Sequence, residues 1–207
     1  MNSKIIFQRI VKPSAFIIAL IPLFLLIRKA YSVGLGANPA EKLLHYMGDW
    51  ALNFLMITLV ISPVQQITGF KWPMHLRRMT GLFSFFYATL HLITYVVVDQ
   101  AFIWHDIFED VMKHKRIIAG LLSYILLIPL AMTSTNRMFQ RLGVSRWSSL
   151  HRLTYVSAIG VVIHYLLLVK KDMRMPIIYA VILLVLLGIR VVHKVIKRYA
   201  PVSPISE

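Results

Sequence analysis

The chain has 207 residues, of which 58% are hydrophobic, and its mean hydropathy is +0.70. This apolar share is far above that of a soluble domain, so the composition predicts a polytopic membrane protein. The absence of cysteine excludes disulfides, iron–sulfur clusters and thiolate metal sites. The net charge of +15 comes from basic residues that flank apolar stretches, which indicates membrane topology and argues against nucleic-acid binding.

Three apolar stretches occupy the first half of the chain. The first covers residues 13–27 and is followed by the turn sequence GLGANP. In this turn, Asn38 is placed to cap the next helix and Pro39 to occupy its first position. That second helix is apolar over residues 50–64, and a third uncharged stretch covers residues 79–98. Each stretch predicts a transmembrane helix, because flanking Lys and Arg side chains can extend to the membrane surface and make up for a short apolar length.

The second half predicts three further spans, at residues 117–136, 153–169 and 176–192. Residues 99–115 form the most polar connection and hold four of the eight acidic residues. A basic loop is expected between the fourth and fifth spans, and a basic tail follows the sixth. The sequence therefore predicts an all-α, polytopic helical bundle of six transmembrane helices, forming a single integral membrane domain over residues 1–207.

The distribution of basic residues predicts the orientation in the membrane. Six spans place both termini on one side. The basic residues of that side are Lys4, Arg9, Lys12, Lys71, Arg77, Arg78, Arg137, Arg141, Arg146, Arg152, Arg190, Lys194, Lys197 and Arg198. The opposite side has fewer, namely Arg28, Lys29, Lys42, Lys113, Lys115, Arg116, Lys170, Lys171 and Arg174, and holds every acidic residue except Glu207. The positive-inside rule therefore predicts cytoplasmic termini.

Two of the eight histidines lie inside apolar spans, where ionisable side chains are rare and face the bundle interior. His91 follows Arg78 by 13 residues, and His164 follows His151 by 13 residues. If both helices run the same way, the two histidines lie at one depth, roughly 20 Å above Arg78 and His151. Such a pair could ligate a haem iron. The alternative is a neutral histidine hydrogen-bonded to a neighbouring helix.

Small residues precede each of these histidines on the same helical face. They are Gly81, Ser84 and Ala88 before His91, and Ser157 and Gly160 before His164. They could open a slot for a porphyrin plane, or they could simply allow two helices to pack closely.

His151 is a further candidate metal ligand, but its counterpart at the same depth is Arg78, which cannot bind iron. An ideal helix would also turn it about 220° away from the face of His164. It could bind a second haem with a ligand from elsewhere, contact a propionate or a flavin, or be structural. Arg77 and Arg78 could pair with propionates or an anionic cofactor, or serve as positive-inside anchors.

His45 is a weaker candidate than the two histidines inside the spans. It lies near the outer end of the second helix, with Asp49 one turn further along to orient its ring. The remaining histidines lie in polar connections or in the tail, where a solvated side chain is expected; they are His75, His105, His114 and His193.

Several motifs together resemble a known family. They are GLGANP, LHYMGDWAL, RRMTGLFSFFYATLHLITY, TSTN and WSSLHRLTYVSAIGVVIHY. The chain is similar over nearly its whole length to the MsrQ (YedZ) family, the haem-binding membrane subunit of the bacterial periplasmic methionine sulfoxide reductase system. This family falls within the ferric reductase-like transmembrane group, whose core would cover residues 40–170.

The resemblance implies an inner-membrane b-type cytochrome with one or two haem b groups. It would take electrons from the quinone pool and pass them to a periplasmic, molybdopterin-containing catalytic subunit that repairs oxidised methionine. FMN is implied by the resemblance alone. The larger ferric reductases carry a second histidine where this chain has Arg78, and a fused flavin domain, so the haem count and the electron source are left open.

Two other functions are compatible with the same residues. One is a stand-alone membrane metalloreductase or quinol oxidoreductase with the same core. The other is a non-redox transporter or membrane scaffold that merely buries its histidines. An iron held by two imidazoles has no open position, so the leading hypothesis is an electron-transfer subunit rather than the catalytic one.

Overall fold

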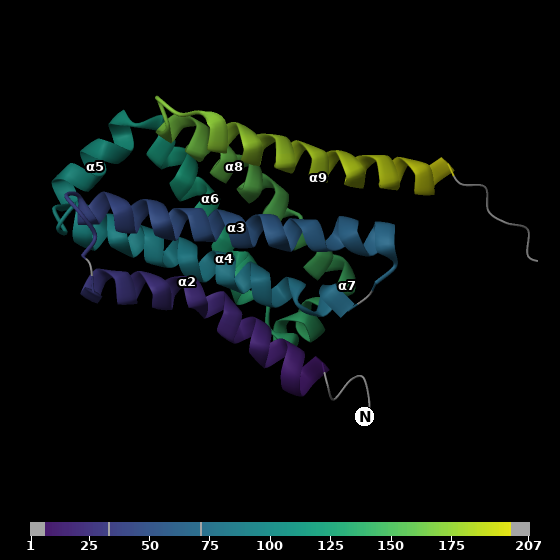
Figure 1. Ribbon diagram of the computed structural model, residues 1–207. Helices are drawn as coiled ribbons and strands as arrows, with labels where there is room; N and C mark the ends of the chain where they lie inside the picture. Colours follow the sequence, from purple (N-terminus) through teal and green to yellow (C-terminus); the bar gives the residue numbers. More distant parts are fainter. Residues whose placement is uncertain (1–6, 33, 71, 200–207) are drawn as a thin grey trace, which may run out of the picture.

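The computed structural model describes residues 7–32, 34–70 and 72–199 of the chain. Three residues used to predict the orientation, Lys4, Lys71 and Glu207, and the side chain of Lys197, lie outside this description. The regular structure in the described ranges is helical throughout (Figure 1): η1 (Phe7–Val11), α2 (Lys12–Ser32), α3 (Pro39–Thr68), η2 (Trp72–His75), α4 (Arg77–Thr94), η3 (Tyr95–Asp99), α5 (Trp104–Lys113), α6 (Lys115–Met132), α7 (Asn136–Leu150), α8 (Leu153–Leu168) and α9 (Arg174–Tyr199). The prediction of an all-α fold is confirmed.

Five helical segments in the described residues are long and apolar enough to cross a membrane by themselves, as judged by length and composition: Phe7–Ser32, Pro39–Thr68, Arg77–Asp99, Lys115–Met132 and Arg174–Ile196. A sixth crossing results if α7 and α8, which are bent by 42° at their junction, count as one broken span. The chain is therefore a multi-pass membrane protein. The fifth predicted span, residues 153–169, corresponds to α8 alone, whose 16 residues are short for a full crossing.

The predicted basic loop before α8 is instead the helix α7. Thr135 caps this helix, since its hydroxyl accepts a hydrogen bond from the Met138 amide at 3.2 Å. Gly143 interrupts the helix with a φ of 72°, a conformation that glycine adopts without steric cost. The polar connection after η3 also contains a helix, α5, which is tied back to the bundle by a 2.8 Å hydrogen bond from the Tyr95 hydroxyl to Asp110.

The central helix of the bundle is α3, which begins as the sequence predicts. Pro39 is its first residue, and the Asn38 side chain accepts a hydrogen bond from the Glu41 amide at 3.3 Å. Half of the most apolar window of α3 is buried, against 17% in each of the other four spans. One apolar cluster joins α3 to α6, α8 and α9, and a second joins it to α2 and α4. Each cluster therefore depends on α3.

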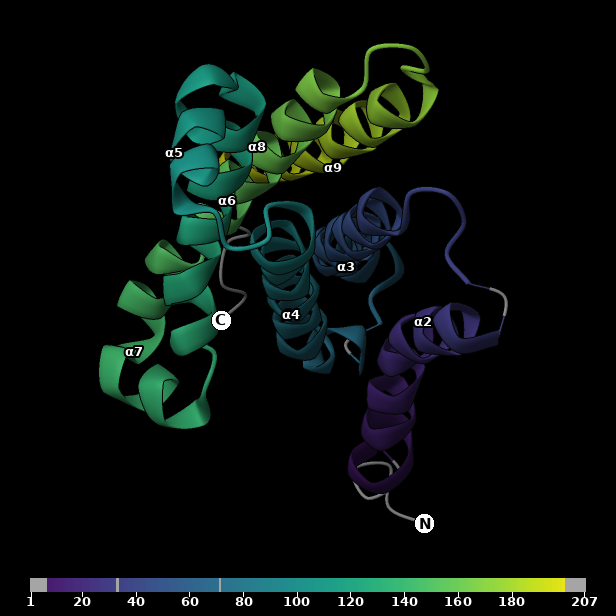
Figure 2. The ribbon, with the colours of Figure 1, turned by 90° about the vertical axis from the view of Figure 1, so that its left-hand side faces the viewer.

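The helices α4 and α8 run in the same direction along the bundle, opposite to α3 and α6 (Figure 1). Viewed along the bundle axis, α4 lies beside α3, and α6 lies between α5 and α8 (Figure 2). The α3–α4 and α6–α8 pairs are the two most extensive helix contacts in the described structure. Because α4 and α8 run in the same direction, His91 and His164 are expected to lie at the same depth.

Arg190 of α9 compensates for a defect in the backbone of α3. Pro63 has no N–H, so the carbonyl of Leu59, one turn earlier, lacks its helical donor. Arg190 donates from Nη2 to that carbonyl at 2.5 Å, and its guanidinium lies 4.8 Å from the centre of the Tyr155 ring. Arg190 is therefore more than one of the basic residues that predict the orientation, since it links α9 to α3 and α8.

We expect Arg190→Leu to lower the stability of the bundle by about 1–3 kcal/mol, because it leaves the Leu59 carbonyl without a donor. The same substitution should cost less in a Pro63→Ala background, where the new amide can bond to that carbonyl. Thermal unfolding in detergent, followed by tryptophan fluorescence, would measure both costs, with the exposed Arg198→Leu as the matched control. Equal costs in the two backgrounds would contradict this explanation.

Candidate functional site

The imidazole rings of His91, on α4, and His164, on α8, lie next to each other. Their centroids are 6.3 Å apart and their planes meet at 83°. Both side chains are only partly accessible within a region of predominantly apolar helices. The juxtaposition expected from the two 13-residue spacings is therefore present.

Each of these imidazoles is hydrogen-bonded to a backbone carbonyl of a neighbouring helix. His91 Nδ1 lies 2.8 Å from the carbonyl oxygen of Leu44 on α3, and His164 Nδ1 lies 2.6 Å from that of Arg116 on α6. A carbonyl can only accept, so each Nδ1 carries the proton and each Nε2 keeps a lone pair. Metal-bound histidines usually have this arrangement, because the carbonyl orients the ring and makes Nε2 more basic.

The separation of the two rings suits a shared metal ion. Two metal–imidazole bonds of about 2 Å, together with the half-rings behind the nitrogens, span roughly 6 Å. Among the residues that the structure describes, no group of three or more His, Asp or Glu side chains is placed to hold a metal ion. The pair therefore fits a metal that brings further ligands with it, as iron in a porphyrin does.

Two glycines that the sequence analysis did not single out lie against these rings. A Cβ atom added to Gly48, on α3, would lie 3.1 Å from Cε1 and Nδ1 of His91. A Cβ added to Gly120, on α6, would lie 2.8 Å from Nδ1 of His164. Each glycine lies four residues after the residue whose carbonyl accepts the hydrogen bond from the imidazole. This spacing can be recognised in the sequence only once the two carbonyls are known.

One of the small residues before each histidine links two helices by a hydrogen bond. The Ser84 hydroxyl donates to the carbonyl of Ala51 at 2.9 Å, and the Ser157 hydroxyl donates to that of Ser123 at 3.0 Å. Gly160 packs against Ser123, whose Oγ would collide with a Cβ at that position. For these positions the geometry favours close helix packing over the alternative of a porphyrin slot.

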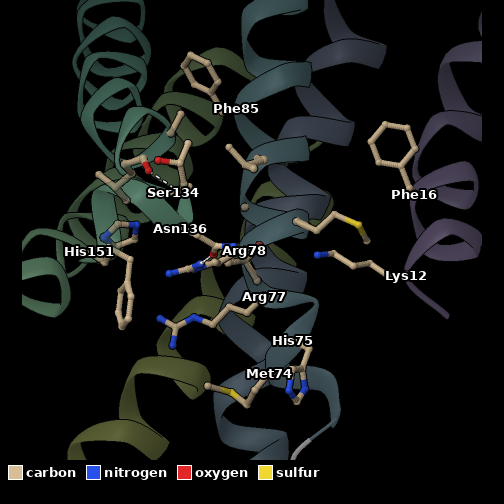
Figure 3. Close-up of a pocket in the computed structure, with 18 of the residues that line it drawn as sticks. Lys12, Phe16, Met74, His75, Arg77, Arg78, Phe85, Ser134, Asn136 and His151 are labelled. Carbon is tan, nitrogen blue, oxygen red and sulfur yellow. Dashed lines mark hydrogen bonds between the residues drawn. The ribbon is translucent and has the colours of Figure 1, made fainter. Parts of the chain in front are cut away.

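A cavity of about 1110 Å³ lies nearer the other end of α4, around Arg78 and His151 (Figure 3). Its walls come from η1, η2, α2, α3, α4, α6, α7, the turn after α7 and the start of α8, and are mostly apolar. Four cationic or ionisable side chains line it in addition to His151; they are Lys12, His75, Arg77 and Arg78. Gly81 also lines this cavity, where a Cβ would meet Thr58 at an ordinary 3.6 Å. The cavity is large enough for a cofactor.

The direction expected for His151 requires it to lie on the same helix as His164, but His151 lies outside α8. It ends α7, and its Nδ1 lies 3.0 Å from the carbonyl oxygen of Trp147, on whose ring it stacks at 3.7 Å. The helical periodicity counted back from His164 therefore does not apply to its direction. Its Nε2 is buried and finds no hydrogen-bond partner among the residues that the structure describes.

Arg78 is held on the same wall of the cavity. Its Nη1 donates to Asn136 Oδ1 at 2.7 Å, and its guanidinium lies 5.0 Å from the centre of the Phe139 ring and 5.1 Å from that of Trp147. Trp147 thus contacts both Arg78 and His151. Cation–π contacts of this kind keep a guanidinium in place while leaving some of its N–H groups available.

His45 lies apart from this cavity, in a small pocket at the start of α3 that also involves Asn38, Tyr46 and Asp49. Its Nε2 is 3.7 Å from Oε1 of Glu41, so the carboxylate that pairs with it precedes it, in place of the expected Asp49. The side chain is 43% exposed. These features are those of a surface histidine.

Comparison with known proteins agrees with this architecture. The family described as "Ferric reductase like transmembrane component" matches residues 47–162. A protein of Rhodospirillum rubrum named "Protein-methionine-sulfoxide reductase heme-binding subunit MsrQ" is 41% identical over 197 residues, 95% of each chain. A protein of the same name from Azospira oryzae is 44% identical over 186 residues, 89% of this chain and 80% of that one.

A longer relative is the magnetosome protein MamZ of Magnetospirillum gryphiswaldense, 42% identical over 185 residues, which are 86% of this chain and 28% of MamZ. The match to the family covers more than half of the chain, and the similarity to its shorter relatives extends over almost all of it. The chain belongs to the MsrQ family, within the ferric reductase-like transmembrane group.

Proposed function

We propose that this chain is the haem-binding, electron-transfer subunit of a methionine sulfoxide reductase system. The observation that carries this proposal is the pair formed by His91 and His164, two adjacent imidazoles whose Nδ1 protons are committed to carbonyls. The names of the relatives, which describe haem-binding subunits, support the same function. The chain would act as one membrane domain over residues 1–207, with residues 40–170 as its core.

His91 and His164 would hold a haem b through their Nε2 atoms. When bound, the haem supplies one-electron redox chemistry. The surrounding residues contribute orientation, through the carbonyls of Leu44 and Arg116, and an apolar environment that excludes water. If both imidazoles bind the iron, no position is left on it for a substrate, so the reduction of methionine sulfoxide would belong to a partner.

The cavity around His151 is the proposed site of a second cofactor. His151 would contribute its unpartnered Nε2 to a second haem or to FMN, and Gly81 leaves room in the wall. Arg77 and Arg78 would pair with propionates or a phosphate, for which guanidinium groups are well shaped. His45 would contribute only at the outer rim, as the weakest of the cofactor contacts.

The proposed location is a bacterial inner membrane, with both termini in the cytoplasm, as the excess of basic residues on that side indicates. Electrons would come from the quinone pool. They would leave at the outer side, nearer to the His91–His164 pair, for a periplasmic, molybdopterin-containing catalytic subunit.

Purified protein in lipid vesicles should show the α-band of a b-type haem in the reduced-minus-oxidised spectrum. Adding a quinol should reduce this haem, and adding the oxidised catalytic subunit should then reoxidise it. If no haem band is present, the protein is a transporter or scaffold. If the band is present but a chelated ferric ion reoxidises the haem while the catalytic subunit does not, the chain is a stand-alone metalloreductase.

A further inference from the structure

The α3–α4 and α6–α8 helix pairs repeat one set of contacts around the two histidines. In each pair, a carbonyl, a glycine and a second carbonyl follow one another at intervals of four and three residues on the first helix. On the second helix, a serine precedes the histidine by seven residues. The residues at corresponding positions of the two first helices are Leu44 and Arg116, Gly48 and Gly120, and Ala51 and Ser123. Those of the two second helices are Ser84 and Ser157, and His91 and His164.

We propose that Gly48 and Gly120 are positioning residues that fix the planes of the two imidazoles close to perpendicular. The proposal rests on the proposed function, in which His91 and His164 are the axial ligands of one haem. It concerns the rotation of each imidazole plane about the bond from Nε2 to the metal, which ligation alone does not determine.

The physical argument starts from the number of contacts that hold each ring. The Cβ–Cγ bond and a single hydrogen bond from Nδ1 to a carbonyl still allow the ring to tilt. The close approach of the ring to a glycine on the same neighbouring helix limits this tilt, because turning further would move the ring into the helix. The close approach requires glycine, since a Cβ would lie 3.1 Å from the His91 ring and 2.8 Å from the His164 ring.

The carbonyl and glycine that position the His91 ring belong to α3, and those that position the His164 ring belong to α6, so the two rings are oriented independently. Each ring plane is set by its own helix pair, and the resulting angle between the planes is 83°. Perpendicular imidazoles donate π density to different d orbitals of a low-spin ferric ion. This keeps those orbitals close in energy and gives a large maximum g value in electron paramagnetic resonance, which falls as the planes approach parallel.

The test uses Gly48→Ala and Gly120→Ala in the full-length protein. We expect both variants to insert normally and to show a lower maximum g value and a shifted midpoint potential, with the larger change for Gly120→Ala. Gly188→Ala on α9 is the control, since a Cβ at this position would meet no atom of the described residues within 4 Å. This control should give the spectrum of the parent.

Unchanged g values in both glycine variants, with haem bound, would overturn the proposal. If Gly120→Ala does not insert, Gly48→Ala decides the question alone, because its contact is longer and less disruptive. The proposed function fails separately, if His91→Ala or His164→Ala keeps the haem. Loss of haem from those two histidine variants, combined with unchanged g values in the glycine variants, would reject only the positioning role.

Discussion

Replacing His91 or His164 with alanine is expected to remove the haem almost completely, while the protein still inserts into the membrane. Each substitution deletes one of the two proposed iron ligands, and no other His, Asp or Glu in the described structure is grouped with the pair to replace it. The helices should remain packed, since the serine and aliphatic contacts along α3–α4 and α6–α8 are untouched. Haem per protein, measured as pyridine haemochrome on matched membrane fractions, is the relevant quantity.

The controls for this prediction are His105→Ala and His193→Ala. His105 is 87% exposed on α5, and His193 is exposed near the end of α9. Both variants should bind haem like the parent. A variant that lacks His91 or His164 but keeps the parent spectrum would show that the two rings are adjacent for structural reasons only.

Gly160→Leu is expected to cause the second largest loss of haem, through helix packing and not by filling a cofactor slot. Its Cβ would collide with Ser123 Oγ, which is already bonded to the carbonyl of Ala119 at 2.7 Å. Overpacking such a contact costs about 1–3 kcal/mol. The resulting shift of α8 against α6 would draw His164 away from the carbonyl of Arg116.

A second substitution separates this explanation from a blocked slot. Adding Ser123→Gly to Gly160→Leu makes room between α6 and α8 and should restore part of the haem content. Gly188→Leu, on α9, should load haem like the parent, since a Cβ at Gly188 would meet no atom of the described residues within 4 Å. If Ser123→Gly restores no haem, the packing explanation is wrong, and Gly160 lines a slot for the porphyrin, the other interpretation of the sequence pattern.

Hydropathy and spacing in the sequence were sufficient to predict the all-α membrane fold and the pairing of the two histidines inside apolar spans. Apolar run length determines a transmembrane helix locally, and the asparagine–proline pair at residues 38 and 39 marks a helix start by capping chemistry alone. Equal spacings of 13 residues place His91 and His164 at one depth, provided that their helices are parallel.

Contacts between helices were decided only by the tertiary structure. Gly48 and Gly120 carry no chemical signal, and their importance comes from the imidazoles that other helices bring against them. The link from Arg190 to the Leu59 carbonyl joins residues 131 positions apart. The stacking of His151 on Trp147 follows from the end of α7, a helix that a basic and weakly apolar segment does not predict. In each case a local pattern defines the helix, while the partner across the interface depends on how the whole bundle packs.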